Sequence, residues 1–141
     1  MDVRDVDFKR DIITIQEGKG RKMAILPMNK DLRKALAAYL EVRNSNNEEA
    51  FFLSKRGTRL TDRGIQFQFR NYFDQISLPD KTIHSLRHSF TKNLLDAGTE
   101  LTVVAELSRH ESLETTRTYL TPGEKDLRYA VDRISTETEF I

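Results

Sequence analysis

The chain contains no cysteine and no tryptophan, and it has only three prolines and six glycines. Without cysteine it can form neither a disulfide bond nor a thiolate metal site. No stretch approaches the ~20 apolar residues that a membrane-spanning helix needs, and the N-terminus lacks the apolar segment of a signal peptide. These absences predict a cytoplasmic protein without a membrane partner.

An excess of charge of either sign is also missing, because 23 Lys and Arg residues nearly balance 22 Asp and Glu, for a net charge of +1. That total does not by itself indicate a nucleic-acid partner. The distribution is uneven, since residues 124–139 are rich in carboxylates and two loop regions, 19–22 and 55–63, are rich in lysine and arginine. An acidic tail can conceal a basic surface in a whole-chain sum, although ordinary solvated loops carry such charges too.

Length and patterning predict one domain of α+β class, mostly helical, with a small antiparallel sheet. The β-branched segment 11–16 and a returning segment, 22–26, flank a Gly-Lys-Gly turn and predict a hairpin, and residues 50–53 predict a short buried strand. About six helices are expected to pack with this sheet. The first two are capped by Asn29 and Thr61, and the others span 84–97, 101–107, 113–119 and 124–134.

The helix expected over 84–97 separates packing from chemistry. Its apolar inner face is predicted to consist of Leu86, Phe90 and Leu94. A different face carries polar side chains at spacings of three and four, namely His84, Arg87, His88 and Thr91. Gly98 is a suitable stop for this helix.

Five side chains with acid, base or nucleophilic chemistry form a sparse set along the chain. The guanidinium of Arg87 is a planar fork that can grip two phosphate oxygens, and His84 lies one helical step before it. A histidine has a reference pKa near neutrality, which suits proton transfer. The set suits cleavage of a phosphodiester with tyrosine as the nucleophile and without a metal, and its members are Lys19, His84, Arg87, His110 and Tyr119.

Each of these residues also has an ordinary interpretation. A His-x-x-Arg step occurs by chance in many proteins, a hairpin lysine is usually just exposed, and a histidine often caps a helix end. The Lys19 turn joins two strands, so it does not open a helix as a glycine-rich phosphate loop does. A zinc site is disfavoured because His84 and His88 lack the glutamate of His-Glu-x-x-His and no carboxylate stands at a third-ligand spacing. The remaining tyrosines are interpreted as half-buried core residues, namely Tyr39, Tyr72 and Tyr129.

The order and spacing of the five residues resemble those of the C-terminal catalytic domain of the tyrosine recombinases, the phage-integrase and Xer-like family. The most specific piece is the pattern Leu113-x-Thr115-Thr116-x-x-Tyr119, which follows His110. The resemblance covers nearly the whole chain and implies the fold of that catalytic domain. Two positions depart from the family, because Arg109 stands where it usually has glycine and Ala24 where it often has arginine. The first departure requires a backbone that can carry a side chain at residue 109.

The resemblance implies a reaction in which Tyr119 attacks a DNA phosphate and forms a 3′-phosphotyrosine, with neither metal nor cofactor. Arg87 and His110 would stabilise charge on the phosphate oxygens. His84 would assist the nucleophile, and Lys19 would protonate the leaving 5′ oxygen. The implied partners are double-stranded DNA and further recombinase protomers, the latter bound through the C-terminal helix. The candidate DNA contacts are Arg21, Lys22, Arg56, Arg59, Arg63 and Arg109.

The same resemblance predicts what residues 1–141 lack. The family has a further catalytic arginine, in a Leu-Arg-x-x-Glu helix before the segment that resembles residues 3–8, and an N-terminal DNA-clamping domain. We therefore expect a single truncated catalytic domain, cut from a larger integrase or recombinase and nearly inactive alone. The alternative is a catalytically incompetent DNA-binding or assembly module that keeps the fold. A topoisomerase-like nicking and closing activity uses a similar set of residues.

Overall fold

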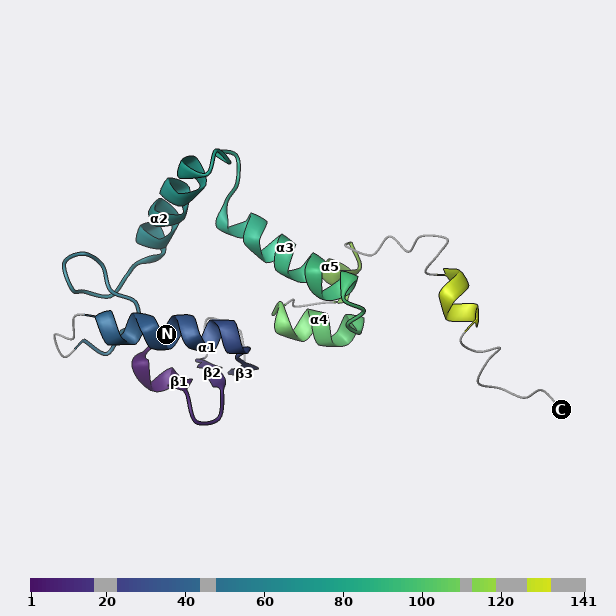
Figure 1. Ribbon diagram of the computed structural model, residues 1–141, viewed down its shortest axis with the longest axis horizontal. Helices are drawn as coiled ribbons and strands as arrows, with labels where there is room; N and C mark the ends of the chain where they lie inside the picture. The colour runs from purple at the N-terminus through teal and green to yellow at the C-terminus, as the bar shows by residue number, and fades with distance from the viewer. Residues whose placement is uncertain (17–22, 44–47, 110–112, 119–126, 133–141) are drawn as a thin grey trace. The chain divides into compact units, whose positions relative to one another are not determined.

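The computed structural model describes residues 1–16, 23–43, 48–109, 113–118 and 127–132 (Figure 1). The chain divides into two compact units, Met1–Ile83 and His84–Ile141, which are described one after the other. The described residues form six helices, one short 3-10 turn and a three-stranded antiparallel sheet. The predicted mostly helical α+β class is therefore confirmed. Within this part of the chain, no helix is long and apolar enough to cross a bilayer.

The first unit contains a small sheet with the strand order β1-β2-β3. After the 3-10 turn η1 (Val3–Asp5), strand β1 (Val6–Asp7) pairs antiparallel with β2 (Ile12–Ile15), which pairs antiparallel with β3 (Ala24–Pro27). The predicted strands of the hairpin are thus present, and its turn lies outside the described residues. Strand β1 is not predicted by the sequence, because two residues carry too little alternation to indicate a strand.

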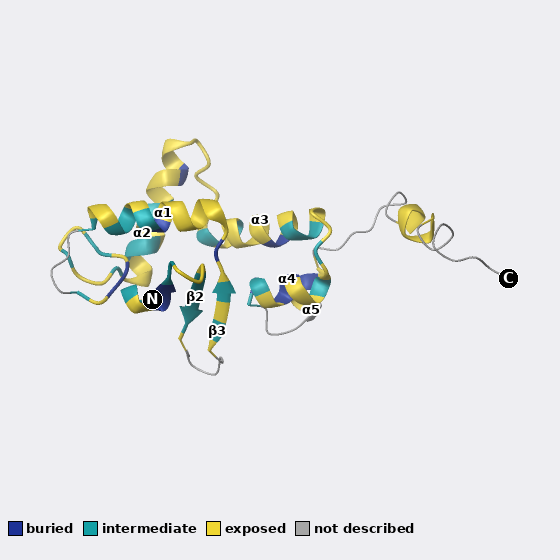
Figure 2. Ribbon diagram, turned by 60° about the horizontal axis from the view of Figure 1, so that its bottom comes forward, coloured by how far each residue is buried: buried dark blue, intermediate teal, exposed yellow. Residues whose placement is uncertain are grey.

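Helix α1 (Lys30–Val42) and the sheet share an apolar cluster, seen as dark blue segments in Figure 2. The predicted cap is present, because the Oδ1 of Asn29 accepts a hydrogen bond from the amide of Leu32 at 2.8 Å. The ring of Tyr39 stacks on that of Phe51 with 5.8 Å between centroids. The buried members of the cluster are Val6, Met28, Leu36 and Phe51.

The segment from Glu48 to Leu53 enters this core without forming a regular strand. The amide of Val3 donates to the carbonyl of Glu49 at 2.9 Å, and the amide of Phe51 donates to that of Met1 at 3.2 Å. At the other end, Leu53 forms a single antiparallel bridge with Arg59. The predicted burial is found at Ala50 and Phe51, but the predicted strand is replaced by isolated bridges. The reason is that its pairing is divided between two different segments.

Helix α2 (Asp62–Gln75) is the last element of the first unit. Its predicted cap is confirmed, because the Oγ1 of Thr61 accepts from the amide of Gly64 at 3.1 Å. Phe73 is buried and its ring lies 6.3 Å from that of Phe69, whereas Phe67 is 64% exposed. The face that carries Ile65, Phe69 and Phe73 at four-residue steps is therefore the less exposed one.

The second unit consists of α3 (Ile83–Asp96), α4 (Leu101–Leu107), α5 (Leu113–Arg117) and a helical segment over 127–132. Its buried residues are small or medium in size, namely Thr91, Val104, Ala105, Ser108 and Thr116. The predicted inner face of α3 is wrong in two positions, because Leu86 and Phe90 are 43% and 46% exposed. Thr91 is fully buried instead, since the end of α4 contacts the Thr91 side of the helix.

Gly98 ends α3 as predicted, in a left-handed conformation with φ of 82°. Its amide donates to the carbonyl of Leu95 at 2.9 Å, and the amide of Thr99 donates to that of Leu94 at 3.1 Å. These two bonds form a Schellman motif, which satisfies carbonyls that the helix itself leaves unpaired. The motif sets the direction in which the chain leaves α3 toward α4.

We predict that Gly98→Ala destabilises the second unit by about 1 kcal/mol, because an L-residue pays that much for the left-handed conformation. A Cβ at this position would meet no atom within 4 Å, so a steric clash does not contribute. Gly98→Asn should cost less, since asparagine tolerates this conformation. Urea unfolding of the three proteins measures the difference, and an alanine variant as stable as the parent would contradict the cap.

Candidate active site

His84 and Arg87 lie one helical turn apart at the start of α3, and both side chains are exposed. The guanidinium Nη2 of Arg87 donates a long hydrogen bond of 3.4 Å to the main-chain carbonyl of Arg109, just beyond α4. His88, the next residue of the helix, is exposed as well. The structure thus brings the predicted phosphate-binding arginine to the residue that directly precedes His110.

The backbone of Arg109 is left-handed, with φ of 56°. Its amide donates to the carbonyl of Glu106 at 3.0 Å, which ends the turn after α4. Glycine adopts this conformation without strain, whereas other residues pay for it. This explains physically why a glycine suits position 109, and it shows that the backbone here carries the arginine side chain, as the sequence requires.

Helix α5 contacts α4 and carries the two predicted threonines. Thr116 is fully buried, whereas Thr115 is exposed. The Oγ1 of Thr118 donates to the carbonyl of Thr115 at 2.8 Å, where the helix ends. Thr116 therefore packs α5 into the second unit, and Tyr119 follows it by three positions in the sequence.

Several predicted site residues lie outside the described part of the chain, namely Lys19, Arg21, Lys22, His110 and Tyr119. The convergence of the five catalytic candidates on one surface stays a prediction. Among the described residues, no group of three or more histidines and carboxylates is arranged to hold a metal ion.

The base of the hairpin that carries Lys19 is fixed by a buried carboxylate that sequence reasoning missed. Asp5 is 3% exposed, and its Oδ1 accepts from the Nε2 of Gln16 at 2.6 Å. Its Oδ2 accepts from the amide of Asp2, also at 2.6 Å. Burial raises the pKa of Asp5, but these two hydrogen bonds and the positive charges of the N-terminal amine and Arg4 together outweigh it, so the pKa lies below its ordinary value. In the sequence, Asp5 is only a carboxylate next to a β-branched residue, Val6. Many exposed loops have the same pattern, so it does not indicate a buried carboxylate.

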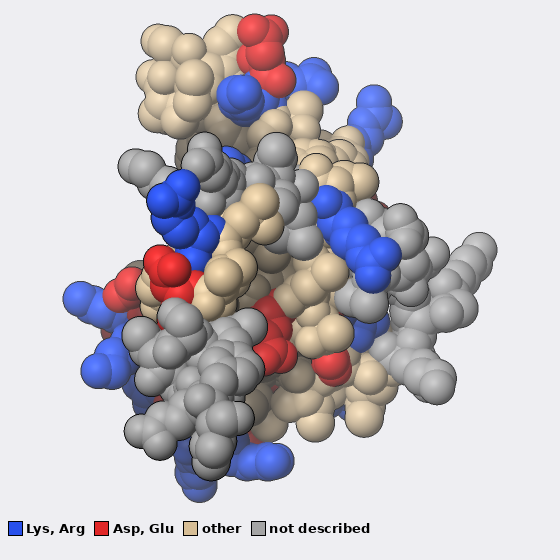
Figure 3. Space-filling view, turned by 90° about the vertical axis from the view of Figure 1, so that its right-hand side faces the viewer, with Lys and Arg blue, Asp and Glu red and all other residues tan. Residues whose placement is uncertain are grey.

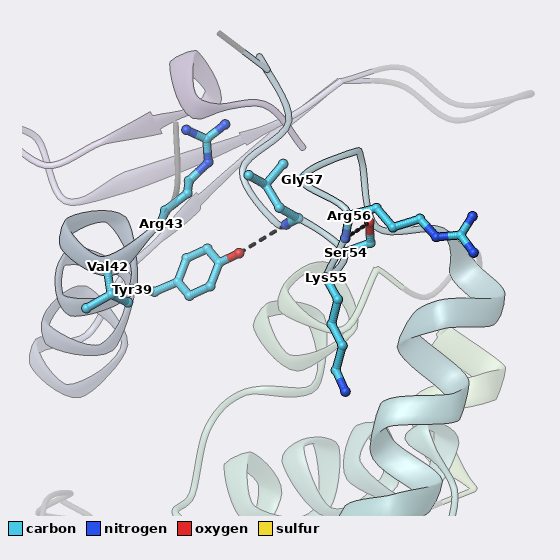
Figure 4. A pocket seen from close by; sticks show the side chains of 8 residues that line it. Tyr39, Val42, Arg43, Ser54, Lys55, Arg56 and Gly57 are labelled. Atoms are coloured by element: carbon cyan, nitrogen blue, oxygen red, sulfur yellow. Dashed lines mark hydrogen bonds between the residues drawn. The ribbon is translucent and has the colours of Figure 1, made fainter. Parts of the chain in front are cut away.

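A basic turn borders a shallow cavity of about 250 Å³ in the first unit (Figure 4). Lys55 and Arg56 line it from the turn, and Tyr39 lines it from α1, with its hydroxyl accepting from the amide of Leu53 at 3.0 Å. Arg43 also lines it, but its guanidinium donates to the carbonyls of Glu48, Ala50 and Phe51. Arg56 is thus the predicted DNA contact at this cavity, and Arg63 is exposed in the first turn of α2.

Arg59, another candidate DNA contact, is bound by a carboxylate of its own unit. Its Nη2 lies 2.6 Å from the Oδ1 of Asp2, and this hydrogen bond raises the pKa of Arg59. Arg4 also pairs with Asp2, at 3.6 Å. Figure 3 shows acidic side chains among the lysines and arginines on the face that it draws, in line with the small net charge.

Residues 1–125 match the phage integrase family, and the chain therefore belongs to that family. The tyrosine recombinase XerC of Roseiflexus castenholzii is 37% identical over 126 residues, which are 84% of this chain and 40% of that protein. The tyrosine recombinase XerA of Pyrococcus horikoshii is 29% identical over 133 residues, 93% of this chain and 46% of that protein. The chain thus spans less than half the length of these relatives. The predicted family is confirmed.

Solved structures confirm the predicted fold of a tyrosine recombinase catalytic domain. The crystal structure of XerA recombinase has a TM-score of 0.76 and 27% identity, and the match covers 99% of this chain and 50% of that one. The XerH site-specific recombinase, solved in a pre-cleavage complex with its difH substrate, has a TM-score of 0.72 and 26% identity, over 93% of this chain and 40% of that one.

We predict that Asp5→Asn lowers the free energy of unfolding of the first unit by about 1–3 kcal/mol at neutral pH, because one oxygen that accepts a hydrogen bond becomes an amide donor. The pKa of Asp5 is depressed in the folded protein, so its carboxylate contributes stability above the unfolded pKa of about 3.9. That contribution is lost as the pH falls through the folded pKa.

Urea unfolding at several pH values measures this effect. The stability difference between parent and variant should be constant above pH ~5 and should shrink in more acidic solution. Asp7→Asn is the control, since within the described part of the chain Asp7 accepts hydrogen bonds only from the exposed amides of Lys9 and Arg10. Equal effects at both positions would contradict a special role of the buried carboxylate.

Proposed function

We propose that this chain is the catalytic part of a site-specific DNA recombinase, which cuts and rejoins DNA through a 3′-phosphotyrosine. The observation that carries the proposal is the family match over residues 1–125, a span that includes all five predicted catalytic residues. The partner is double-stranded DNA, which is supported by the related XerH, solved on its difH substrate.

In the first step the Oη of Tyr119 attacks a DNA phosphorus atom. A phosphorus–oxygen bond to tyrosine forms as the bond to the 5′ oxygen breaks. His84 takes the proton of the phenol, whose ordinary pKa of ~10 makes it a weak nucleophile until that proton leaves, and Lys19 gives a proton to the departing 5′ oxygen. The 5′ hydroxyl of a second strand then attacks the phosphotyrosine in the reverse sequence. One phosphorus–oxygen bond is exchanged for another in each step, so the exchange requires no ATP.

Arg87 binds the non-bridging oxygens of the phosphate and stabilises the charge that develops on them, together with His110. Its exposure at the start of α3 supports this role, because a phosphate can reach the guanidinium. The carbonyl of Arg109 accepts from one N–H group of the Arg87 guanidinium. The other N–H groups remain for bidentate hydrogen bonding to a phosphate.

Lysines and arginines of the first unit contact the DNA backbone and fix the register of the protein on the duplex. Arg56 and Arg63 suit this role best among the described candidates, because both are exposed. Arg59 would first have to leave Asp2, which makes it the weaker candidate.

Further recombinase protomers bind through the C-terminal helix. This part of the proposal is supported by the helical segment 127–132, whose residues are all exposed. Its apolar side chains include Leu127 and Val131, one turn apart and 59% and 67% exposed. An apolar pair at this spacing is typical of a helix that packs against a partner.

We predict that the 141-residue chain forms almost no covalent adduct with a suicide DNA substrate, whereas a longer chain carrying the upstream arginine forms one readily. One guanidinium cannot replace a two-arginine clamp on the phosphate, and the loss of one preorganised donor typically costs about 100- to 1000-fold in rate. Gel electrophoresis of denatured reactions measures the adduct. In the longer chain Tyr119→Phe should abolish it, because only the phenolic oxygen can form the bond.

Tyr72→Phe, in α2, is the matched control and should leave the adduct unchanged, since it removes a phenol that the mechanism does not use. An adduct that survives Tyr119→Phe would refute the assignment of the nucleophile. A longer chain that binds DNA but never forms an adduct would favour the assembly module.

We also predict weak, salt-dependent DNA binding by the 141-residue chain, because each phosphate contact releases counterions from the duplex. Arg63→Ala should reduce the slope of log affinity against log salt by about 1, with little dependence on DNA sequence. Arg33→Ala is the control, because that guanidinium already binds Asp11 at 2.7 Å and the carbonyl of Phe8 at 3.2 Å. Fluorescence anisotropy at several salt concentrations gives the slopes, and equal changes for both variants would exclude a specific role of Arg63.

A further inference from the structure

A pair of buried hydroxyl groups connects α3 to the end of α4. The Oγ1 of Thr91 lies 2.9 Å from the Oγ of Ser108. Thr91 has no exposed area and Ser108 is 5% exposed, so water does not compete for this bond. Within the described part of the chain, no buried side-chain nitrogen or oxygen lacks a hydrogen-bond partner. A buried hydroxyl without its partner would be costly, and the pair therefore fixes one specific arrangement of the two helices.

The hydroxyl pair and the Arg87 contact join the same two segments of the chain, α3 and the residues after α4. Thr91 follows Arg87 by four residues on α3, so both side chains project from the same side of the helix. Ser108 immediately precedes Arg109, whose carbonyl accepts from Arg87. Two adjacent residues after α4 are therefore tied to two residues of α3, by a buried bond at Thr91 and an exposed bond at Arg87 (α3 and α4 are seen in Figure 1).

We propose that Thr91 and Ser108 are positioning residues for the guanidinium of Arg87. The buried bond sets the place of the Arg109 carbonyl, and that carbonyl orients the guanidinium fork toward a DNA phosphate. Arginine has many rotamers, and an exposed one needs a fixed acceptor if it is to meet a phosphate already oriented. The long 3.4 Å contact makes the acceptor's position decisive, because such a bond is lost after a small displacement. This inference rests on the proposed function of Arg87.

A purely structural role for the pair makes the opposite prediction for two conservative variants. Thr91→Val keeps the volume and branched shape of the side chain but removes the hydroxyl. Thr91→Ser keeps the hydroxyl but removes a methyl group from a buried site. Packing alone would favour valine, whereas positioning through the hydrogen bond requires serine.

The double variant Thr91→Val with Ser108→Ala separates stability from positioning. Thr91→Val alone leaves the hydroxyl of Ser108 buried without a partner, which destabilises the unit. Removing both hydroxyls abolishes that penalty, so much of the stability should return. In the double variant the Arg109 carbonyl should nevertheless stay displaced, because no directional bond then connects Thr91 to residue 108.

The first measurement is the rate of adduct formation at saturating suicide DNA substrate, in the longer chain that carries the upstream arginine. Thr91→Val and the double variant should be slower by about 10- to 100-fold, since a displaced binding group acts on the chemical step. Thr91→Ser should stay within about threefold of the parent. Phe73→Leu, which weakens the packing of α2 outside the cluster that supports the Lys19 strands, is the control for stability and should leave this rate unchanged.

The second measurement does not depend on activity. In the 141-residue chain, the side-chain Nε–Hε resonance of Arg87 can be assigned by its loss in Arg87→Lys. It should shift in Thr91→Val and in the double variant, and it should keep its position in Thr91→Ser. A double variant with the parent's rate and the parent's Arg87 resonance would overturn the proposal. If the parent longer chain itself formed no adduct, the proposed function would fall, and the resonance alone would decide the positioning contact.

Discussion

Burial of the Phe51 ring is the interaction on which the first unit depends. The ring has no exposed area and packs in one cluster with Val6 of β1 and Leu36 of α1. Its amide is held by the carbonyl of Met1. A buried phenylalanine typically contributes about 3–5 kcal/mol relative to alanine, a large share of the 5–15 kcal/mol that stabilises a domain. Because this ring joins the N-terminus, the sheet and α1, the strands that flank the Lys19 turn rely on it.

The second unit is held together differently. Its buried residues include three hydroxyl side chains, Thr91, Ser108 and Thr116, whereas two large apolar side chains of α3, Leu86 and Phe90, are exposed. An apolar core tolerates small shifts of its helices, whereas a buried hydrogen bond demands one distance and one angle. The reactive side chains of α3 thus stand on a framework whose geometry is specified by polar contacts more than by volume.

Local signals predicted most of the elements. Asn29 and Thr61 cap their helices through the expected side-chain oxygens, and Gly98 ends α3 in the expected left-handed conformation. These features depend on a few neighbouring residues, so the sequence is sufficient to predict them. The family could be predicted because the spacing of its motif residues along the chain is itself the signal, whereas the roles of the candidate site residues stay predictions.

Long-range pairing was not predictable in the same way. The anchoring of Gln16 by Asp5, the ion pair of Arg59 with Asp2 and the pairing of Phe51 with Met1 join residues 11 to 57 positions apart. The burial of Thr91 in place of Phe90 is a similar case, because periodicity identifies an apolar face but cannot say which neighbour will cover it. These pairings and the burial of Thr91 depend on tertiary contacts between segments that are distant in the sequence.

Met1 and Asp2 form hydrogen bonds and an ion pair that hold the first unit together. The carbonyl of Met1 accepts from Phe51, the amide of Asp2 donates to Asp5, and the carboxylate of Asp2 balances Arg59. Loss of these two residues would therefore open the core from its edge, although it would remove no helix or strand. Anyone who shortens the chain for crystallography or fuses a reporter to it should keep Met1 and Asp2 and attach the linker before them.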